Sequence, residues 1–257
     1  MNIWAVANQK GGVGKTTTTV TLGGILVERG YKVLLIDTDP HASLTYYFGI
    51  DSEDLDNSVY DIFMQGKNLT KEQLLQTLCP TSVENMDILP ATMALATLDR
   101  KMGNQSGMGL VLKNALQLLD DEYDFAIVDC PPVLGVLMVN ALAACKRILV
   151  PVQTEFLALK GLDRMMRTLY LMSRSQKRDY KYTIIPTMFD KRTRASTEAH
   201  KELLETYDDK VWSSVVPVDT KFRDASLDKL VPSAYAPKSR GVIAYNDLLT
   251  FLLKVDQ

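Results

Sequence analysis

The segment ANQKGGVGKTTTT, residues 7–19, has the composition of a loop that binds phosphate. Its glycines let the backbone fold closely around an anion, because glycine has no side chain and tolerates positive φ angles. Lys15 stands where an ammonium group would bridge a β- and a γ-phosphate, and the hydroxyl of Thr16 would reach a Mg²⁺ ion. The same segment carries a second lysine, Lys10, which one phosphate site does not by itself explain.

Carboxylates follow two apolar runs further along the chain. Asp37 and Asp39 come after LLI in LLIDTDPHAS, and Asp129 closes the run FAIV in YDFAIVDCPP. The second pattern is typical of a strand whose final carboxylate hydrogen-bonds the water shell of Mg²⁺. Two carboxylates two residues apart can divide the work, one holding metal-bound water and the other orienting the attacking water. We do not expect the neighbouring His41 to act as a general base, because it is a single histidine beside carboxylates that already suffice for base chemistry.

Short apolar, β-branched runs and the helical patterns between them predict the strands and helices around these residues. Apolar runs without alternation are typical of strands buried on both faces. The predicted strands are residues 2–7, 32–37, 86–91, 125–129, 147–152, 182–187 and 211–217. The predicted helices are residues 16–29, 110–119, 133–144, 157–172, 196–207 and 241–253.

Alternating strands and helices predict a doubly wound α/β fold, with a mostly parallel sheet and helices on both faces. Ligands of such sheets bind at the carboxyl ends of the strands. The phosphate loop and all three aspartates come directly after predicted strands. We expect a single domain over residues 1–257, since no linker or repeat marks a boundary, and an acidic surface excursion over residues 51–71.

The composition is that of an ordinary globular protein, with 46% apolar and 23% charged residues among 257. No run reaches the ~18 to 20 apolar residues that a membrane helix requires. The N-terminus lacks the basic flank and cleavage site of a signal peptide, so we expect a cytoplasmic location. The cysteines, Cys79, Cys130 and Cys145, are widely separated, which argues against a disulfide framework or a structural zinc site.

The loop K-G-G-V-G-K-T-T resembles the deviant Walker A loop of the ParA/MinD family of ATPases, with Gln9 where the general P-loop pattern has glycine. Further segments that resemble this family extend from residue 2 to about 253, effectively the whole chain. The resemblance implies a P-loop NTPase that uses ATP and Mg²⁺. In that family the earlier lysine reaches across a face-to-face dimer. The resemblance therefore implies that Lys15 binds the nucleotide of its own subunit, and that Lys10 neutralises charge in the partner's site.

The resemblance also implies roles for individual residues. In the D-x-D-P segment, Asp37 would contact the Mg²⁺ shell and Asp39 would position or activate water, which makes Lys10, Lys15 and Asp39 the expected catalytic residues. The expected metal residues are Thr16, Asp37 and Asp129. The expected nucleotide-binding residues are Gly11, Gly12, Val13, Gly14, Lys15, Thr16 and Thr17, with Asp190, Pro217 and Asp219 near adenine. The DPHAS form looks like ParA-like proteins of chemotaxis gene clusters.

ParA and Soj-like members of the family bind DNA nonspecifically as ATP-bound dimers, and a partner protein stimulates hydrolysis. The match implies DNA contacts by Arg192 and Lys221, with Arg194 and Arg223 close by. Residues 160–240 carry 17 Lys or Arg against 11 Asp or Glu, although the whole chain has a net charge of −2. That balance is consistent with phosphate contacts.

We therefore expect a homodimer with ATP, a ParB-like or cargo-adaptor partner, and a nucleoid-associated or polar location. The cargo would be a chromosome or plasmid locus, or a chemotaxis or polar protein cluster.

Two other functions of the same structural class stay open. A membrane-cycling ATPase like MinD would need a terminal basic amphipathic helix. This chain ends NDLLTFLLKVDQ, with one lysine and two acids, so we expect no membrane insertion. A metabolic ligase like dethiobiotin synthetase would need a small-molecule pocket beside the γ-phosphate. Lys10 and the D-x-D-P segment favour the ParA group over the ligase.

Overall fold

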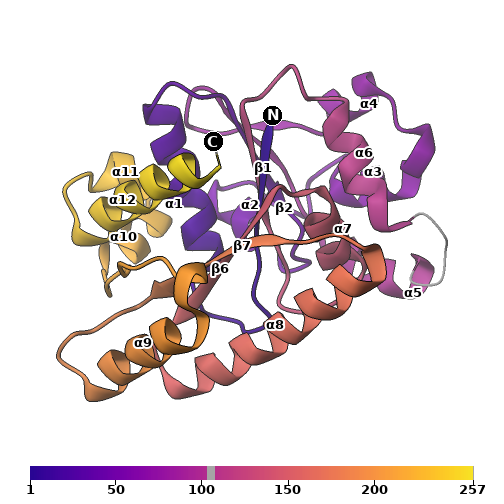
Figure 1. Ribbon diagram of the computed structural model, residues 1–257. Helices are drawn as coiled ribbons and strands as arrows, with labels where there is room; N and C mark the ends of the chain where they lie inside the picture. The colour runs from indigo at the N-terminus through magenta and orange to yellow at the C-terminus, as the bar shows by residue number, and fades with distance from the viewer. Residues whose placement is uncertain (103–107, 257) are drawn as a thin grey trace.

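The computed structural model describes residues 1–102 and 108–256. Within them, seven strands form one sheet in the order β3-β4-β2-β5-β1-β6-β7. Neighbouring strands are parallel except β3 and β4, which are antiparallel. The strands are β1 Asn2–Val6, β2 Val33–Asp37, β3 Cys79–Pro80, β4 Met86–Leu89, β5 Phe125–Asp129, β6 Arg147–Gln153 and β7 Lys181–Thr187. The sheet passes through the middle of the molecule, with helices on both sides (Figure 1).

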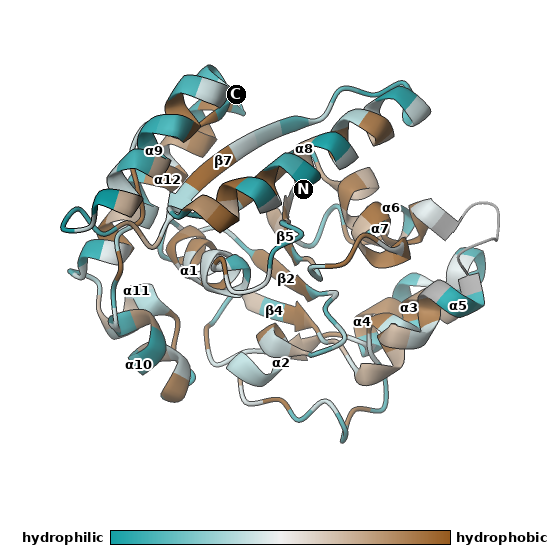
Figure 2. Ribbon diagram, turned by 90° about the horizontal axis from the view of Figure 1, so that it is seen from below, coloured by the Kyte–Doolittle hydropathy of each residue, from teal (hydrophilic) through white to brown (hydrophobic). Residues whose placement is uncertain are grey.

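Both faces of the sheet are buried, as the uninterrupted apolar runs predict. Successive side chains of a strand point to opposite faces, so Ala5 of β1 joins one apolar core while Trp4 and Val6 join the other. In β5, Val128 and Ile127 divide in the same way. Side chains of α3, α6, α7, α8 and α9 complete the first core, and side chains of α1, α2 and α12 complete the second. Figure 2 shows the apolar colouring of the central strands between these layers.

The helices connect the strands and flank the sheet. Their bounds are α1 Lys15–Glu28, α2 Ser43–Tyr47, α3 Val59–Gln65, α4 Lys71–Gln76, α5 Leu98–Met102, α6 Val111–Gln117, α7 Val136–Ala144, α8 Phe156–Gln176, α9 Arg194–Tyr207, α10 Lys221–Leu227, α11 Pro232–Tyr235 and α12 Arg240–Val255. Short 3₁₀ turns lie at Gly66–Asn68, Met93–Thr97, Met108–Leu110 and Asp208–Lys210. The doubly wound α/β prediction is confirmed.

Two predictions about elements are wrong. Residues 211–217 do not form a strand, because this segment meets β7 only through isolated bridges of Val211 with Ile184 and of Pro217 with Phe189. The acidic stretch 51–71 is not wholly a surface excursion. It contains α3, which begins with a capping box at Ser58 and contributes Val59, Ile62 and Phe63 to the core.

The C-terminal helix α12 packs into the second core, as its composition predicts. Val242, Tyr245, Leu248 and Leu252 are buried along one face. The residue that follows, Asp256, accepts hydrogen bonds from the Trp4 indole at 2.9 Å and the Arg147 guanidinium at 2.7 Å. Within the described chain, no helix has both the length and the apolar character needed to cross a membrane.

Candidate nucleotide and magnesium site

The phosphate loop lies between β1 and α1, at the carboxyl end of the sheet. Gly12 and Gly14 have φ angles of 74° and 92°, a conformation that a residue with a Cβ rarely adopts. Gly14 is the N-cap of α1, and neither a capping side chain nor an acidic residue occupies the first turn. The first backbone N–H groups of a helix have no intrahelical partner and carry the positive end of its dipole. The arrangement is suited to an anion.

Hydrogen bonds to neighbouring strands hold this loop in place. Asn8 donates to the carbonyl of Pro151 in β6 at 2.9 Å and accepts from the backbone N–H of Lys10 at 3.0 Å. The Thr187 hydroxyl of β7 donates to the Val13 carbonyl at 2.9 Å. The loop is therefore tied to two strands, which preorganises its backbone N–H groups.

The two lysines of the loop contact different parts of the chain. Lys15 is 8% exposed, and its Nζ lies 3.4 Å from the backbone carbonyl of Lys10, so it curls back over the loop. Lys10 instead pairs through its Nζ with Glu155, the N-cap residue of α8. Both groups of this pair are partly exposed, at 26% and 41% of their side chains. Lys15 is thus placed for the loop itself, and Lys10 stands at its rim.

Asp129 ends β5 beside the start of α1. The Thr16 hydroxyl donates to Asp129 Oδ2 at 2.6 Å, whereas Oδ1 is buried without a hydrogen-bond partner among the described residues. Burial, followed by the charge of Asp37, raises the pKa of Asp129 to about 8. A buried carboxylate with an unpaired oxygen suits a cation or its hydration shell, because either would supply the missing partner.

Asp37 ends β2 directly opposite Asp129 in the parallel register. It accepts hydrogen bonds from the Thr45 backbone at 2.9 Å, the Thr45 hydroxyl at 2.8 Å and the Asp39 backbone at 3.0 Å. Burial raises the pKa of Asp37 to about 6, and the Thr45 hydrogen bonds oppose that rise. Thr16, Asp37 and Asp129 therefore converge, and hard oxygen donors of this kind fit magnesium.

Asp39 lies two residues beyond Asp37 and keeps part of its carboxylate accessible. Its Oδ1 accepts the backbone N–H and the ring Nδ1 of His41, each at 3.0 Å. The Asp39 side chain is 16% exposed and that of His41 is 78% exposed. Asp39 stands at the margin of the buried pair, and its neighbour His41 faces solvent.

The residues expected near the nucleoside lie around two adjoining cavities. Pro217 and Asp219 line a cavity of about 300 Å³ that also borders Gly14 and Thr17 of the loop and α1. The Asp219 carboxylate is oriented by the chain itself, because its oxygens accept from the backbone N–H groups of Lys221 at 3.0 Å and Gly241 at 2.9 Å. We interpret Asp219 as a residue that shapes this cavity.

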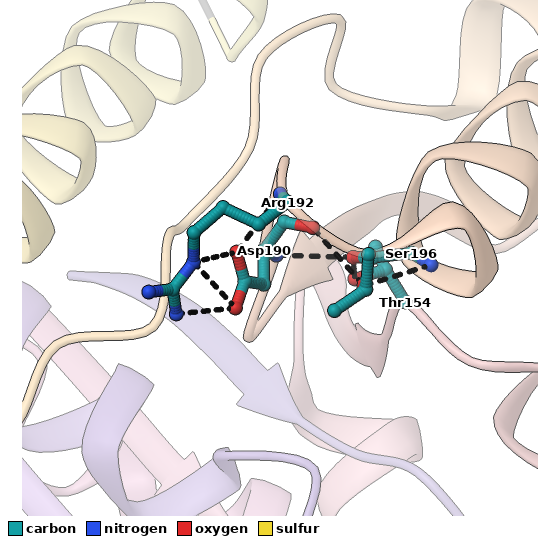
Figure 3. Close-up of polar contacts among 5 residues, drawn as sticks. Thr154, Asp190, Arg192 and Ser196 are labelled. Carbon is teal, nitrogen blue, oxygen red and sulfur yellow. Dashed lines mark hydrogen bonds and ion pairs between the residues drawn. The ribbon is translucent and has the colours of Figure 1, made fainter.

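Asp190 lies in the neighbouring cavity, of about 460 Å³, which shares Pro217 and Asp219 with the first. Its carboxylate is held by Arg192 in a bidentate contact at 2.7 and 2.9 Å, and this contact lowers the pKa of Asp190 to about 2 (Figure 3). The backbone of Asp190 also donates to the Ser196 hydroxyl at 3.0 Å, which in turn contacts Thr154.

The expected DNA residues form what we call the basic rim, defined as Arg192, Arg194, Lys221 and Arg223. The bridge between Phe189 and Pro217 brings the two segments that carry them side by side. Arg192, Arg194 and Lys221 are exposed but engaged, with Asp190, Glu198 and Asp224 respectively. Arg223 borders the cavity beside the phosphate loop. The structure thus places the two segments side by side and pairs three of the four cations with carboxylates.

Sequence reasoning missed several residues at the site. Glu155 binds Lys10, Thr45 holds Asp37, and the buried Tyr245 hydroxyl lies 2.7 Å from the Thr18 hydroxyl of α1 while bordering the smaller cavity. The sequence position of Glu155 could have marked it as a site residue, because it follows the predicted strand 147–152 and ligand-binding residues gather at the carboxyl ends of strands. Nothing in their local patterns marks Thr45 or Tyr245.

The chain matches a family model described as an AAA domain over residues 1–182. It is 37% identical to the sporulation initiation inhibitor protein Soj of Bacillus subtilis, over 96% of each chain. It is 32% identical to the chromosome partitioning protein ParA of Myxococcus xanthus, over 99% of this chain and 88% of that protein.

A solved structure is similar along its whole length. Cobyrinic acid a,c-diamide synthase from Mycobacterium smegmatis, with a bound ATP analog and magnesium, has a TM-score of 0.84 and 34% identity. The match covers 99% of this chain and 95% of that one. The likeness to known proteins therefore extends well beyond the phosphate loop.

Proposed function

This chain belongs to the ParA/Soj-like family of P-loop ATPases, and from that premise we propose that it is an ATP-dependent dimerising switch that positions a cellular cargo. ATP and Mg²⁺ are its cofactors. The observation that carries the proposal is the placement of the two lysines. Lys15 is buried against the loop, whereas Lys10 lies at the edge of the loop, where its Nζ pairs with Glu155 in a partly exposed contact.

The chemistry we propose is ATP hydrolysis. Lys15 and the N-terminus of α1 bind the β- and γ-phosphates, and Thr16, Asp37 and Asp129 hold Mg²⁺ through its ligands or water shell. Bound there, the ion would neutralise charge that develops on the phosphate oxygens. Asp39 orients the attacking water, since its carboxylate is the accessible one of the three. Lys10 leaves Glu155 and adds its charge to the site of a second subunit.

Dimerisation would then make binding to other molecules depend on whether ATP is bound. In the ATP-bound dimer, the basic rims of both subunits would form one surface for nonspecific DNA contact, and hydrolysis stimulated by a cargo adaptor or ParB-like partner would release it. The similarity to Soj and to a chromosome partitioning protein supports a positioning role. A nucleoid or polar location follows from that role. The cargo, chromosomal, plasmid-borne or chemotactic, is chosen by the partner.

One specific observation favours a second candidate. A 34% identical structure carries the name of a diamide synthase, which points to an ATP-dependent ligase. The larger cavity, beside Asp190 and Arg240, has room for a small substrate. We favour the switch because Lys10 serves no evident purpose in a ligase. A membrane-cycling role has less support, since the apolar face of α12 is buried.

The test compares the two lysines. Lys15→Ala should lose ATP binding by roughly a hundredfold or more, because the phosphate charge is left uncompensated. Lys10→Ala should still bind ATP within a few-fold of wild type, yet lose most of its hydrolysis. Lys113→Ala, which changes an exposed lysine of α6, is the control. Calorimetry and phosphate release are the measurements. Normal turnover by Lys10→Ala would contradict the switch and leave the ligase in place.

A further inference from the structure

The outward face of α8 carries side chains that the proposed nucleotide site does not use. This helix lies along the outside of the molecule, as Figures 1 and 2 show. Leu162, Met165 and Leu169 pack into the core on its inner side. We define the α8 face as the exposed residues Phe156, Lys160, Arg164, Arg167, Leu171 and Arg174. At 100° per residue they fall within an arc of about 80°, and at 1.5 Å per residue they extend over ~27 Å.

Large apolar side chains stand at both ends of this face. Phe156 is 62% exposed and Leu171 is 65% exposed, and the adjoining Tyr170 is 60% exposed. Cations lie over the two rings, with Lys160 Nζ 5.5 Å from the Phe156 centroid and the Arg174 guanidinium 5.9 Å from that of Tyr170. Each end of the face thus combines exposed apolar surface with a cation, a combination that suits a contact surface.

The positive charge of the α8 face is largely uncompensated. Asp163 lies 4.0 Å from Lys160, and its other contact is the Tyr207 hydroxyl. Across the described ranges 1–102 and 108–256, we find no carboxylate within 4 Å of Arg164, Arg167 or Arg174. The exposed side of α9 differs, because its cations form i,i+4 pairs: Arg194 with Glu198 and Lys201 with Glu205.

We propose that the α8 face docks an acidic amphipathic helix of a partner protein. Carboxylates three or four residues apart on that helix would meet the cations from Lys160 to Arg174, and its apolar residues would cover Phe156 and Leu171. Phosphates of a DNA duplex would satisfy the cations but would leave both apolar side chains in water. A second copy of this face would bring like charges together. The mixture of charge and apolar surface therefore fits an acidic protein segment best.

The position of α8 gives this docking site access to the loop. Its N-cap is Glu155, which holds Lys10, so a helix seated on the α8 face would lie within about one turn of that contact. The proposal does not depend on the ATPase switch, because binding is measured without nucleotide. If the peptide did not bind, the proposed ATPase switch would be unaffected, and the converse also holds.

The probe is a fluorescent helical peptide of about 20 residues, with leucine at heptad a and d positions, glutamate at e and g, and alanine elsewhere to limit like-charge repulsion. A matched peptide carries lysine for glutamate, and a short DNA duplex serves as competitor. Anisotropy is measured on the full chain for wild type, Arg164→Glu/Arg167→Glu, Phe156→Ala/Leu171→Ala and Lys201→Glu on α9. Circular dichroism checks that each variant is folded.

We expect the acidic peptide, and not the basic one, to bind wild type. Charge reversal should weaken binding at least about tenfold and the apolar truncation at least about threefold, with Lys201→Glu unchanged. The proposal is overturned if wild type ignores the acidic peptide or if the α9 control loses as much as the α8 variants. It is overturned equally if the apolar truncation has no effect while duplex DNA displaces the peptide, since the face would then be a nucleic-acid surface.

Discussion

The phosphate loop and the basic rim differ in how their side chains are held. Around the loop, Asp37 and Asp129 are buried and tied to other elements, by Thr45 of α2 and by Thr16 of α1 respectively. Each paired cation of the rim is exposed and bonds a carboxylate two to four residues away in the sequence. The first region is held in one geometry, whereas we expect the second to exchange its local partners for phosphates.

The largest effect should come from the buried region. Asp129→Asn keeps the shape of the side chain but removes the charge that faces the expected magnesium site. We expect hydrolysis to fall by roughly a hundredfold or more, because transition-state charge loses its counterion. Phosphate release over a magnesium titration measures this. Wild-type turnover at every magnesium concentration would show that Asp129 does not hold the ion.

A smaller effect should come from the basic rim. Arg192→Glu combined with Lys221→Glu should weaken retention on DNA by roughly tenfold and lower the log-log salt slope by about one for each phosphate that the variant no longer neutralises. ATP hydrolysis without DNA should change little, because neither side chain touches the loop. Lys113→Glu on α6 is the matched charge control. If it weakens retention as much as the rim variant, the effect reflects net charge and the rim has no specific role.

The smallest effect should come from freeing one rim cation. Asp190→Asn removes the carboxylate that holds Arg192, so we expect DNA retention to rise about two- to threefold, in line with the modest strength of exposed ion pairs. Nucleotide affinity, measured in parallel, separates the release of Arg192 from a role of Asp190 near adenine. If retention stays flat while nucleotide affinity drops, Asp190 belongs to the nucleoside site alone.

Local patterns predict much of the fold, whereas the functions that they assign to the site residues stay predictions. The apolar run FAIVD predicts β5 at its observed bounds, and the glycine loop between a strand and a helix predicts the anion site. Residues 211–217 misled because apolar composition cannot tell a strand from a segment that makes isolated bridges. Glu155 was missed because its contact with Lys10 is distant in sequence, and Thr45 because a threonine eight residues after Asp37 has no local pattern that marks it.

We propose that Lys10 serves the site of a second subunit, and the mass of Asp39→Ala in solution tests this placement. This variant should bind magnesium and ATP but hydrolyse slowly, since it lacks the group that orients water. Light scattering on a sizing column should give the mass of a dimer with magnesium-ATP and of a monomer without nucleotide, and Lys10→Ala in the same background should restore the monomer. A single monomer peak for saturated Asp39→Ala would contradict the account.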